Sequence, residues 1–310
     1  MLMVGIDEAG YGPKLGPLCV GCAALRVPGA TPEAAPELWE ALAPAVARWA
    51  GRKGATVLVD DSKKLKRSGA EPLRELERTA RVHLGLLGDE VTTDRAALAA
   101  LGAEVPAADL ADTPLGQPAD QIGIATNVVR RAYAAAGVTA ELFAVDSISA
   151  SRFNREWRDT RSKAAIELGV IAPRLRWAWE RAGEGALVSL DRLGGRTRYL
   201  GVLREALPGI EICESAREDD RLVYECAGDG RSMRIEVLVG GDGRRYAVAL
   251  ASVLAKWTRE LVMARFNHAH TLLAPELKPT AGYGTDANRW IRDAREMLGR
   301  ERVDPLVRLA

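Results

Sequence analysis

Two adjacent acidic residues, Asp7 and Glu8, directly follow the apolar residues Val4 and Ile6, which predict a buried strand. Successive side chains of a strand point to opposite faces, so both carboxylates can serve one site only near a strand end, a bulge or a turn. The two glycines and the proline of residues 10–13 supply such a break. Carboxylates beside a buried strand are costly to desolvate unless a positive group pairs with them, and hard divalent cations prefer oxygen ligands. The alternative is an ordinary turn whose acids are solvated.

Two further aspartates repeat this pattern. Asp191 ends the apolar run 186–190 and precedes two glycines, and Asp242 lies in a Gly-Gly-Asp-Gly sequence after the predicted strand 233–239. A single aspartate of this kind is commonplace. Three of them in one α/β chain predict acids that converge at one rim of a sheet.

Lys63 and Lys64 follow a short strand-like run, 56–59, and a cap for a predicted helix at Asp61 or Ser62. Backbone amides at a helix N-terminus, together with ammonium groups, suit a phosphate. The alternative, a solvated charged cap, is favoured by the local sequence.

The composition limits the class of protein. With 47% hydrophobic and 27% charged residues, the 310-residue chain has the composition of a soluble globular protein with a sizeable core. Its formal net charge of +1 gives no bulk electrostatic reason for a nucleic-acid partner, so such a partner would need a local basic patch. We expect no membrane association, because no apolar run is long enough to span a bilayer. The sequence shows no signal-peptide pattern, so we expect a cytoplasmic protein.

The cysteines and histidines suggest no metal or redox site. Cys19 and Cys22 form a single Cys-x-x-Cys in an apolar run, without a second pair of matching spacing, so core packing is favoured over metal or redox use. His268 and His270 follow a helical pattern and lack a third ligand, so we interpret them as surface residues.

The elements that must position these residues alternate between strands and helices, which predicts an α/β fold. We predict strands over 4–6, 17–27, 56–59, 84–93, 141–145, 186–190, 210–215, 222–226 and 233–239. We predict helices over 37–49, 71–84, 94–102, 120–136, 151–166, 175–179, 246–268 and 286–298, with Pro173 interrupting or restarting the helical region. The small residues of 247–252 predict that this helix packs closely against a sheet.

Five segments, in this order, resemble the type 2 ribonuclease H family, ribonucleases HII and HIII. They are Gly-Ile-Asp-Glu-Ala-Gly-Tyr-Gly-Pro at 5–13, Asp-Ser-Lys-Lys-Leu at 61–65, 151–154, 241–259, and Gly-Tyr-Gly-Thr at 282–285. The resemblance extends from residue 4 to about residue 290. It does not explain the length of the segment from about 85 to 145, which we interpret as inserted or extended.

The resemblance implies a single ribonuclease H-like domain over 1–310, with a mixed five-stranded sheet, helices on both faces and a C-terminal helical cap at about 270–310. It also implies four metal-binding carboxylates, which fall on Asp7, Glu8, Asp191 and Asp242. The segment at Asp191 lacks the usual Asp-Gly after its strand, which leaves Asp146 and Asp219 as substitutes.

The implied activity is hydrolysis of the RNA strand in RNA–DNA hybrids or at RNA–DNA junctions. Two Mg²⁺ or Mn²⁺ ions can activate a water, stabilise the leaving oxygen and relieve anionic repulsion. Tyr11 stands where ribonuclease HII normally has arginine, which leaves the cleavage of a single embedded ribonucleotide open. The positions that match the family's sugar contacts are Gly10, Tyr11, Gly12 and Tyr283. Our candidates for phosphate contacts are Lys63, Lys64, Lys256 and Arg259.

Two other functions stay open. The chain could bind hybrids or junctions with little catalysis, which Tyr11 and the irregular Asp191 segment motivate. It could also be a metal-dependent nuclease for another nucleic acid, such as structured DNA. In each case we expect a monomer.

Overall fold

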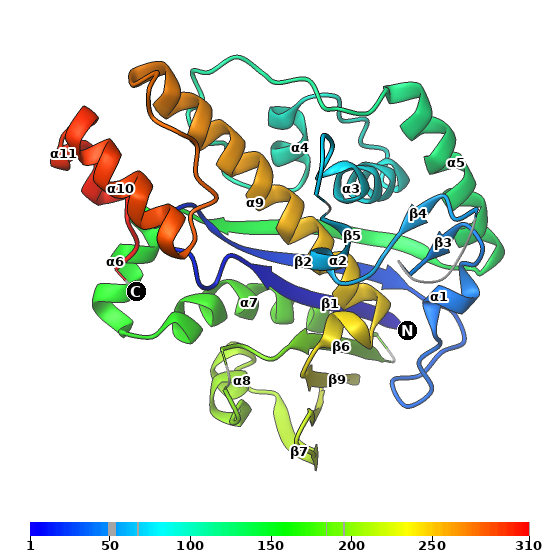
Figure 1. Ribbon diagram of the computed structural model, residues 1–310. Coiled ribbons are helices and arrows are strands. Elements are labelled where there is room, and N and C mark those ends of the chain that lie inside the picture. Colours follow the sequence, from blue (N-terminus) through cyan, green and yellow to red (C-terminus); the bar gives the residue numbers. More distant parts are fainter. Residues whose placement is uncertain (49–53, 67, 184, 195, 310) are drawn as a thin grey trace.

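The central element of the fold is a mixed seven-stranded sheet in the order β5-β2-β1-β6-β9-β8-β7 (Figure 1). The computed structural model describes residues 1–48, 54–66, 68–183, 185–194 and 196–309. The strands are β1 (Leu2–Ala9), β2 (Leu18–Arg26), β5 (Thr139–Ile148), β6 (Ala186–Asp191), β7 (Glu211–Arg217), β8 (Arg221–Gly228) and β9 (Arg231–Leu238). Two short strands, β3 (Val46–Ala47) and β4 (Val57–Leu58), form a separate parallel pair.

The centre of the sheet consists of three parallel strands, β1, β6 and β9, with antiparallel strands on either side. In β1 and β6, Ile6 pairs with Leu190, so the next residues, Asp7 and Asp191, reach the same edge. Asp191 in turn pairs with Leu238, near the end of β9. This register gathers the strand-end acids at one rim.

The helices lie on both faces of the sheet (Figure 1). One core contains residues of α9, α3 and α5, and the opposite core contains residues of α7 and α8. The helices are α1 (Leu38–Ala41), α2 (Ser62–Leu65), α3 (Arg74–Leu86), α4 (Asp94–Ala100), α5 (Ala119–Ala135), α6 (Ala150–Thr160), α7 (Lys163–Glu180), α8 (Leu200–Ala206), α9 (Tyr246–Leu273), α10 (Gly284–Leu298) and α11 (Arg300–Val303), with 3-10 turns η1 (Gly241–Gly243) and η2 (Asp304–Leu306). No helix in the described part of the chain is both long and apolar enough to cross a membrane.

The close contact between α9 and the sheet depends on glycine. A Cβ on Gly5 of β1 would lie 2.0 Å from the Ala247 carbonyl carbon, and a Cβ on Gly21 of β2 would lie 2.2 Å from the Ala251 carbonyl oxygen. The backbone of α9 therefore rests directly on the sheet, as the small residues of 247–252 predict.

The α/β class and the helices on both faces agree with the sequence, but the expected five strands are wrong. The five central strands are present, and the β7–β8 hairpin adds two more beside β9. Residues 210–215 and 222–226 carry the pattern of strands, so the count of five came from the resemblance and not from the local pattern.

Four local predictions also differ from the structure. The expected helix 151–166 is divided into α6 and α7, because Arg161, the residue directly after α6, is in a left-handed conformation. Residues 84–93 form no strand, because the buried residues of α3 continue the helix to Leu86. The expected helix 37–49 is only α1, followed by β3, and Trp49 lies outside the described residues. Pro173 lies inside the continuous helix α7. The apolar side of α7 packs into the core, which outweighs the backbone hydrogen bond that proline cannot donate.

Candidate metal centre

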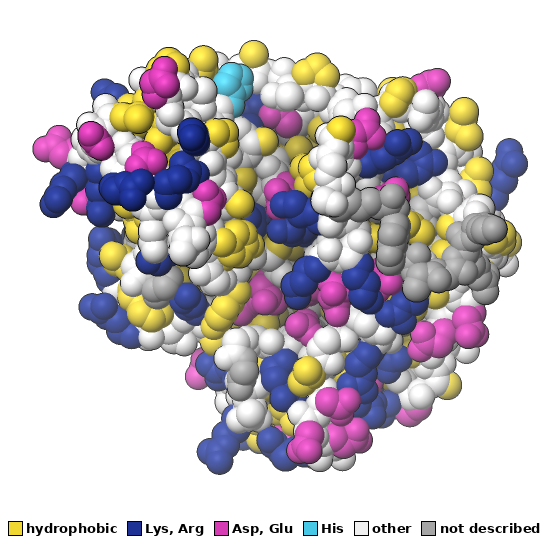
Figure 2. All heavy atoms as spheres, in the orientation of Figure 1, with side chains coloured by type: hydrophobic (Ala, Val, Ile, Leu, Met, Phe, Trp, Pro, Cys, Tyr) yellow, Lys and Arg dark blue, Asp and Glu magenta, His cyan; other side chains and the backbone are white. Residues whose placement is uncertain are grey.

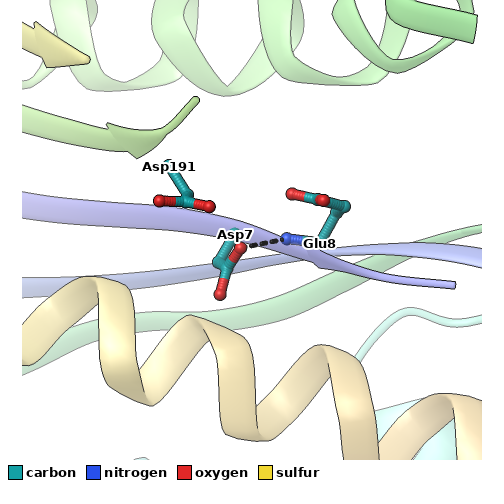
Figure 3. Close-up of side chains that lie close together, drawn as sticks. All are labelled: Asp7, Glu8 and Asp191. Atoms are coloured by element: carbon teal, nitrogen blue, oxygen red, sulfur yellow. Dashed lines mark hydrogen bonds between the residues drawn. The ribbon is translucent and has the colours of Figure 1, made fainter. Parts of the chain in front are cut away.

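Three acidic residues, Asp7, Glu8 and Asp191, meet at the ends of β1 and β6 (Figure 3). Each offers one carboxylate oxygen, and these oxygens all lie within 4.8 Å of one another. Asp7 is buried, and the other two are partly exposed. The group could hold a metal ion, because closely spaced carboxylate oxygens are ligands that hard cations prefer.

Asp7 and Glu8 approach the group from opposite faces of the sheet. Figure 3 shows the Asp7 side chain directed toward α9, whereas Glu8 extends away from that helix. One Asp7 carboxylate oxygen accepts a hydrogen bond of 2.7 Å from the Glu8 amide, which fixes the orientation of Asp7. The two adjacent acids can serve one site because they lie at the end of β1.

Asp191 connects the group to the turn that carries Asp242. Its Oδ1 accepts a hydrogen bond of 2.8 Å from the Gly241 amide in η1. Asp242 is not part of the three-residue group, but its charge raises the pKa of Asp7, and Asp191 raises the pKa of Asp242. Asp242 therefore lies within electrostatic reach of the other acids.

The acids destabilise one another in the absence of a cation. Burial raises the pKa of Asp7 well above its usual value, and the charges of Glu8 and Asp191 raise it further. Burial, followed by the charges of Glu167 and Asp191, raises the pKa of Glu8 to about 8. Among the residues that the structure describes, none of these acids forms an ion pair with a basic side chain.

One oxygen of the group also lacks a hydrogen-bond donor. Glu8 Oε2 is buried and has no hydrogen-bond partner, and a buried polar atom without a partner costs free energy. A divalent cation would satisfy this oxygen and offset the repulsion among the acids. The donor set therefore fits a hard divalent ion.

Sequence reasoning missed a fifth acid, Glu167 of α7. It is fully buried, and neither of its carboxylate oxygens has a hydrogen-bond partner. Its only signal in the sequence is its place beside the apolar residues Ile166, Val170 and Ile171, which face the core of that layer.

The two lysines after β4 occupy different environments. Burial, followed by the charges of Asp61 and Asp191, raises the pKa of Asp242, and the nearby Lys63 ammonium group offsets part of this rise. Lys64 instead forms an ion pair of 3.0 Å with Asp60. Asp61 caps only the four-residue helix α2, through a bond of 2.9 Å from the Lys63 amide, and α3 begins separately at Arg74.

Arg259 is enclosed by other parts of the chain. It is 1% exposed, and its Nη2 donates to the carbonyls of Leu15 and Ala281. Its guanidinium carbon lies 4.6 Å from the ring centroid of Tyr283, which is 41% exposed. In this structure Arg259 supports the Tyr283 turn, and its contact with a phosphate stays a prediction.

Lys256 has a partner of its own. Its Nζ lies 2.8 Å from Glu260 Oε1 and 5.9 Å from the centroid of the Tyr283 ring. Like Lys64, Lys256 is engaged in an ion pair, and its contact with a phosphate stays a prediction.

The glycine-rich loop after β1 places Tyr11 beside the acids. Gly10 has φ of +90°, a conformation that favours glycine, and a Cβ there would lie 2.6 Å from the Pro17 carbonyl oxygen. Gly12 is exposed. Burial, then Glu167 and Glu8, raises the pKa of Tyr11, and Lys163 Nζ lies 5.5 Å from the centroid of its ring.

The remaining candidates do not join the group. Asp146 forms an ion pair of 2.8 Å with Arg174, and Asp219 lies exposed before β8, so neither replaces Asp191. Cys19 and Cys22 are buried in the two opposite cores, which excludes a shared metal or redox site. His270 packs against Phe266 and Trp290 and is only partly exposed, so it is not the simple surface residue that the sequence suggests.

No protein-family model matches the sequence, and neither does any curated protein. Among solved structures, ribonuclease H2 from Pyrococcus horikoshii OT3 is similar with a TM-score of 0.50 and 14% identity, over 99% of this chain and 92% of that one. A chain of the PCNA:RNase HII complex from Archaeoglobus fulgidus has a TM-score of 0.44 and 15% identity, over 100% of this chain and 94% of that one. Bst-RNase HIII in complex with Mn²⁺ has a TM-score of 0.45 and 13% identity, over 100% and 66%. At 14% identity, the similarity to the Pyrococcus enzyme concerns the fold alone. The chain therefore shares its fold with ribonuclease H2, which is the fold that its motifs predict.

Proposed function

We propose that this protein is a Mg²⁺- or Mn²⁺-dependent endoribonuclease that hydrolyses the RNA strand of RNA–DNA hybrids or RNA–DNA junctions. The observation that carries the proposal is the group of Asp7, Glu8 and Asp191, whose oxygens converge without a basic partner among the described residues. The shared fold with ribonuclease H2 supports it.

The residues of the chain have distinct roles in this proposal. Asp7, Glu8, Asp191 and Asp242 would hold two divalent ions, which when bound supply an activated water and stabilise the leaving oxygen. Asp7 is held by the Glu8 amide, and the charges of Glu8, Asp191 and Asp242 all act on it, so it would be the ligand that the other three acids surround electrostatically. The hydrogen bond from Gly241 to Asp191 keeps the turn of Asp242 close to the strand ends.

The surface around the acids suits a nucleic-acid backbone. Figure 2 shows acidic side chains gathered near the centre of one face, with Lys and Arg side chains around them. Such a local arrangement can attract phosphates although the net charge is only +1. Lys63 and Lys64 are the proposed phosphate contacts, which position a duplex without reading its sequence.

Two loops would recognise the sugar. The backbone of Gly10, Tyr11 and Gly12 lies next to Glu8, and reading a 2′-hydroxyl is how a protein distinguishes RNA from DNA. Tyr283 is exposed, and its ring stacks on the buried Arg259 guanidinium. This contact would hold the ring in place for packing against a sugar.

Cleavage of three labelled substrates tests this proposal: a uniform RNA–DNA hybrid, a duplex with one ribonucleotide, and plain DNA, each with Mg²⁺ or Mn²⁺. We expect cleavage of the uniform hybrid and no cleavage of plain DNA, and the duplex with one ribonucleotide decides whether Tyr11 permits cleavage at a single site. Asp7→Asn and Asp242→Asn should lower kcat on the order of 10³-fold, because each removes a charge that stabilises the ions of the transition state. Asp219→Asn, at an exposed position, is the matched control.

Each alternative predicts a different outcome. Binding of the hybrid without product at any metal concentration would indicate a binding protein. Cleavage of DNA in preference to the hybrid would indicate a nuclease for another substrate. Full activity of Asp7→Asn in a correctly folded protein would contradict the proposed site.

A further inference from the structure

Glu167 differs from the other buried acids of the described chain. It lies in the second turn of α7, is 0% exposed, and has two carboxylate oxygens without a hydrogen-bond partner. A carboxylate in this situation costs several kcal/mol unless something pairs with it. Glutamate is almost never fully buried without such a partner.

The chain satisfies its other fully enclosed carboxylates. Glu236 accepts from Arg221, Arg245 and Ser189. Glu77 pairs with Arg81 and also accepts from two backbone amides.

The unsatisfied carboxylate oxygens occur together. Among the buried atoms of the described residues, only Glu8 Oε2 and both oxygens of Glu167 are carboxylate oxygens without a partner. Glu8 lies on β1 and Glu167 on α7, and this strand and this helix contact each other. After burial, Glu167 is the largest influence on the pKa of Glu8, and Asp7 and Asp191 act on Glu167.

The direction of the side chains agrees with this placement. Residues Leu2, Val4 and Ile6 of β1 point into the core that contains α7, and Glu8 continues the same alternation. On α7, Glu167 precedes Val170 and Ile171, which pack into that core. Glu167 therefore reaches the end of β1 from the face opposite to α9.

We propose that Glu167 is a fifth carboxylate of the cation site and that, together with Glu8, it binds a divalent cation on the α7 side of the sheet. The inference rests on the metal-binding part of the proposed function. It places cation ligands on both faces of the sheet, with Asp7 and Asp242 nearer α9 and Glu8 and Glu167 nearer α7. The competing role for Glu167 is that of a buried acid with no contact to the cation.

Binding of Mn²⁺ to the metal-free protein, measured by calorimetric titration, tests the proposal without relying on activity. Glu167→Gln keeps the shape of the side chain and removes its charge. We expect Mn²⁺ affinity to fall at least about 10-fold, the range seen when groups around a metal are removed. The rise in Tm that Mn²⁺ produces should shrink, whereas the Tm of the metal-free variant should not fall.

Glu180→Gln is the matched control, because Glu180 is an exposed residue at the end of the same helix. It should bind Mn²⁺ as the wild type does. If Glu167→Gln does not fold, Glu167→Asp keeps the charge but withdraws it by one methylene, and its Mn²⁺ affinity should also fall.

An unchanged Mn²⁺ affinity in a folded Glu167 variant overturns the inference. If the wild type cleaves hybrids while that variant binds Mn²⁺ normally, the inference alone is wrong. If the wild type binds Mn²⁺ through Glu167 and cleaves no nucleic acid, the inference stands and the proposed activity is wrong. A wild type that binds no Mn²⁺ overturns both.

Discussion

Asp7 and Glu8 are neighbours in sequence whose side chains enter different layers of the molecule. They share a site because β1 ends there and because Asp191, one strand away, lies level with Asp7. The cost of this arrangement is burial of the carboxylates together with their mutual repulsion, and burial is the larger of the two causes that raise the pKa values of the acids. The raised pKa values have a measurable consequence for stability.

The metal-free protein should lose stability as the pH rises from 6.5 to 8. The pKa values of Glu8 and Glu167 are raised to about 8, from ordinary values of 4.5. A group whose pKa is raised by folding stabilises the folded state fully below its unfolded pKa, and this contribution is lost as the pH rises through the folded pKa. The free energy of unfolding, measured with urea in the presence of a chelator, should therefore decrease over this interval.

The interval from pH 6.5 to 8 avoids most of the titration of His83, the main group that would oppose this decrease in stability. His83 is buried, and its pKa is lowered to about 4 from 6.5, so most of the change in its contribution falls below pH 6.5. In Glu8→Gln the decrease between pH 6.5 and 8 should be smaller. A stability that rises over the same interval in the wild type would show that folding does not raise the pKa values of these acids.

Four of the acids were predictable as residues, with Glu8 as the neighbour of Asp7, and the fifth was not. Asp7, Asp191 and Asp242 each follow an apolar strand and lie beside glycines, which is a pattern visible in the sequence. Glu167 lies in a helix beside apolar residues, and a sequence does not show whether such a glutamate finds a basic partner. For the same reason Arg259 looked like a surface cation, because only the fold shows that Leu15 and Ala281 enclose it.

Helix α9 shows how one element depends on the absence of a side chain in another. Gly5 lets the first turn of α9 rest against β1, within two residues of Asp7. Tyr246, at the start of the same helix, is fixed by hydrogen bonds of 2.9 Å with His83 and Tyr133. The helix thus supports the strand end on which the acids lie.

Gly5→Ala should destabilise the protein by about 1–3 kcal/mol, the usual cost of inserting a methyl group into a close-packed interface. The neighbouring atoms belong to the Ala247 backbone, which cannot rotate away. Gly169→Ala is the control, because a Cβ at this position in α7 meets no atom within 4 Å. In a helix interior that change should stabilise by about 0.5–1 kcal/mol. Urea denaturation of both variants measures the difference, and equal stabilities would contradict the described contact.

Elements with long periodic patterns were predictable, and short ones were not. The helices near 120–136 and 246–268 were predicted because their apolar spacing extends over many residues. Residues 84–93 are apolar and β-branched enough to suggest a strand, yet the packing of α3 against α5 and α9 determines their structure. The β7–β8 hairpin was visible as two strand patterns, although the family resemblance suggested a sheet without it.

The C-terminal segment contacts the loop that lies beside the site. The C-terminal segment after η2 returns to the loop that follows β1, where Arg308 donates to the carbonyls of Gly10 and Gly16. Asn154 of α6 holds this segment with two hydrogen bonds of 2.8 Å, to the Val307 carbonyl and from the Leu309 amide. A small core around Trp290 joins α10 and Leu15 in the same region.

Asn154→Ala should release the C-terminal segment. The two lost hydrogen bonds predict a destabilisation of about 1–3 kcal/mol. Hydrogen exchange should quicken at the Arg308 amide, which donates to Lys14, and in residues 10–16. Asn127→Ala, at an exposed position of α5, is the control and should leave these amides unchanged. Unaltered exchange in residues 10–16 of Asn154→Ala would show that the loop does not depend on the C-terminal segment.

The central claim is that separate parts of the chain build one cation site at the ends of β1, β6 and β9. Anomalous diffraction from crystals soaked in Mn²⁺ tests it most directly. We predict Mn²⁺ peaks bounded by Asp7, Glu8, Asp191 and Asp242, and their loss in crystals of Asp7→Asn. Peaks elsewhere on the protein, with none among these acids at saturating Mn²⁺, would contradict the claim.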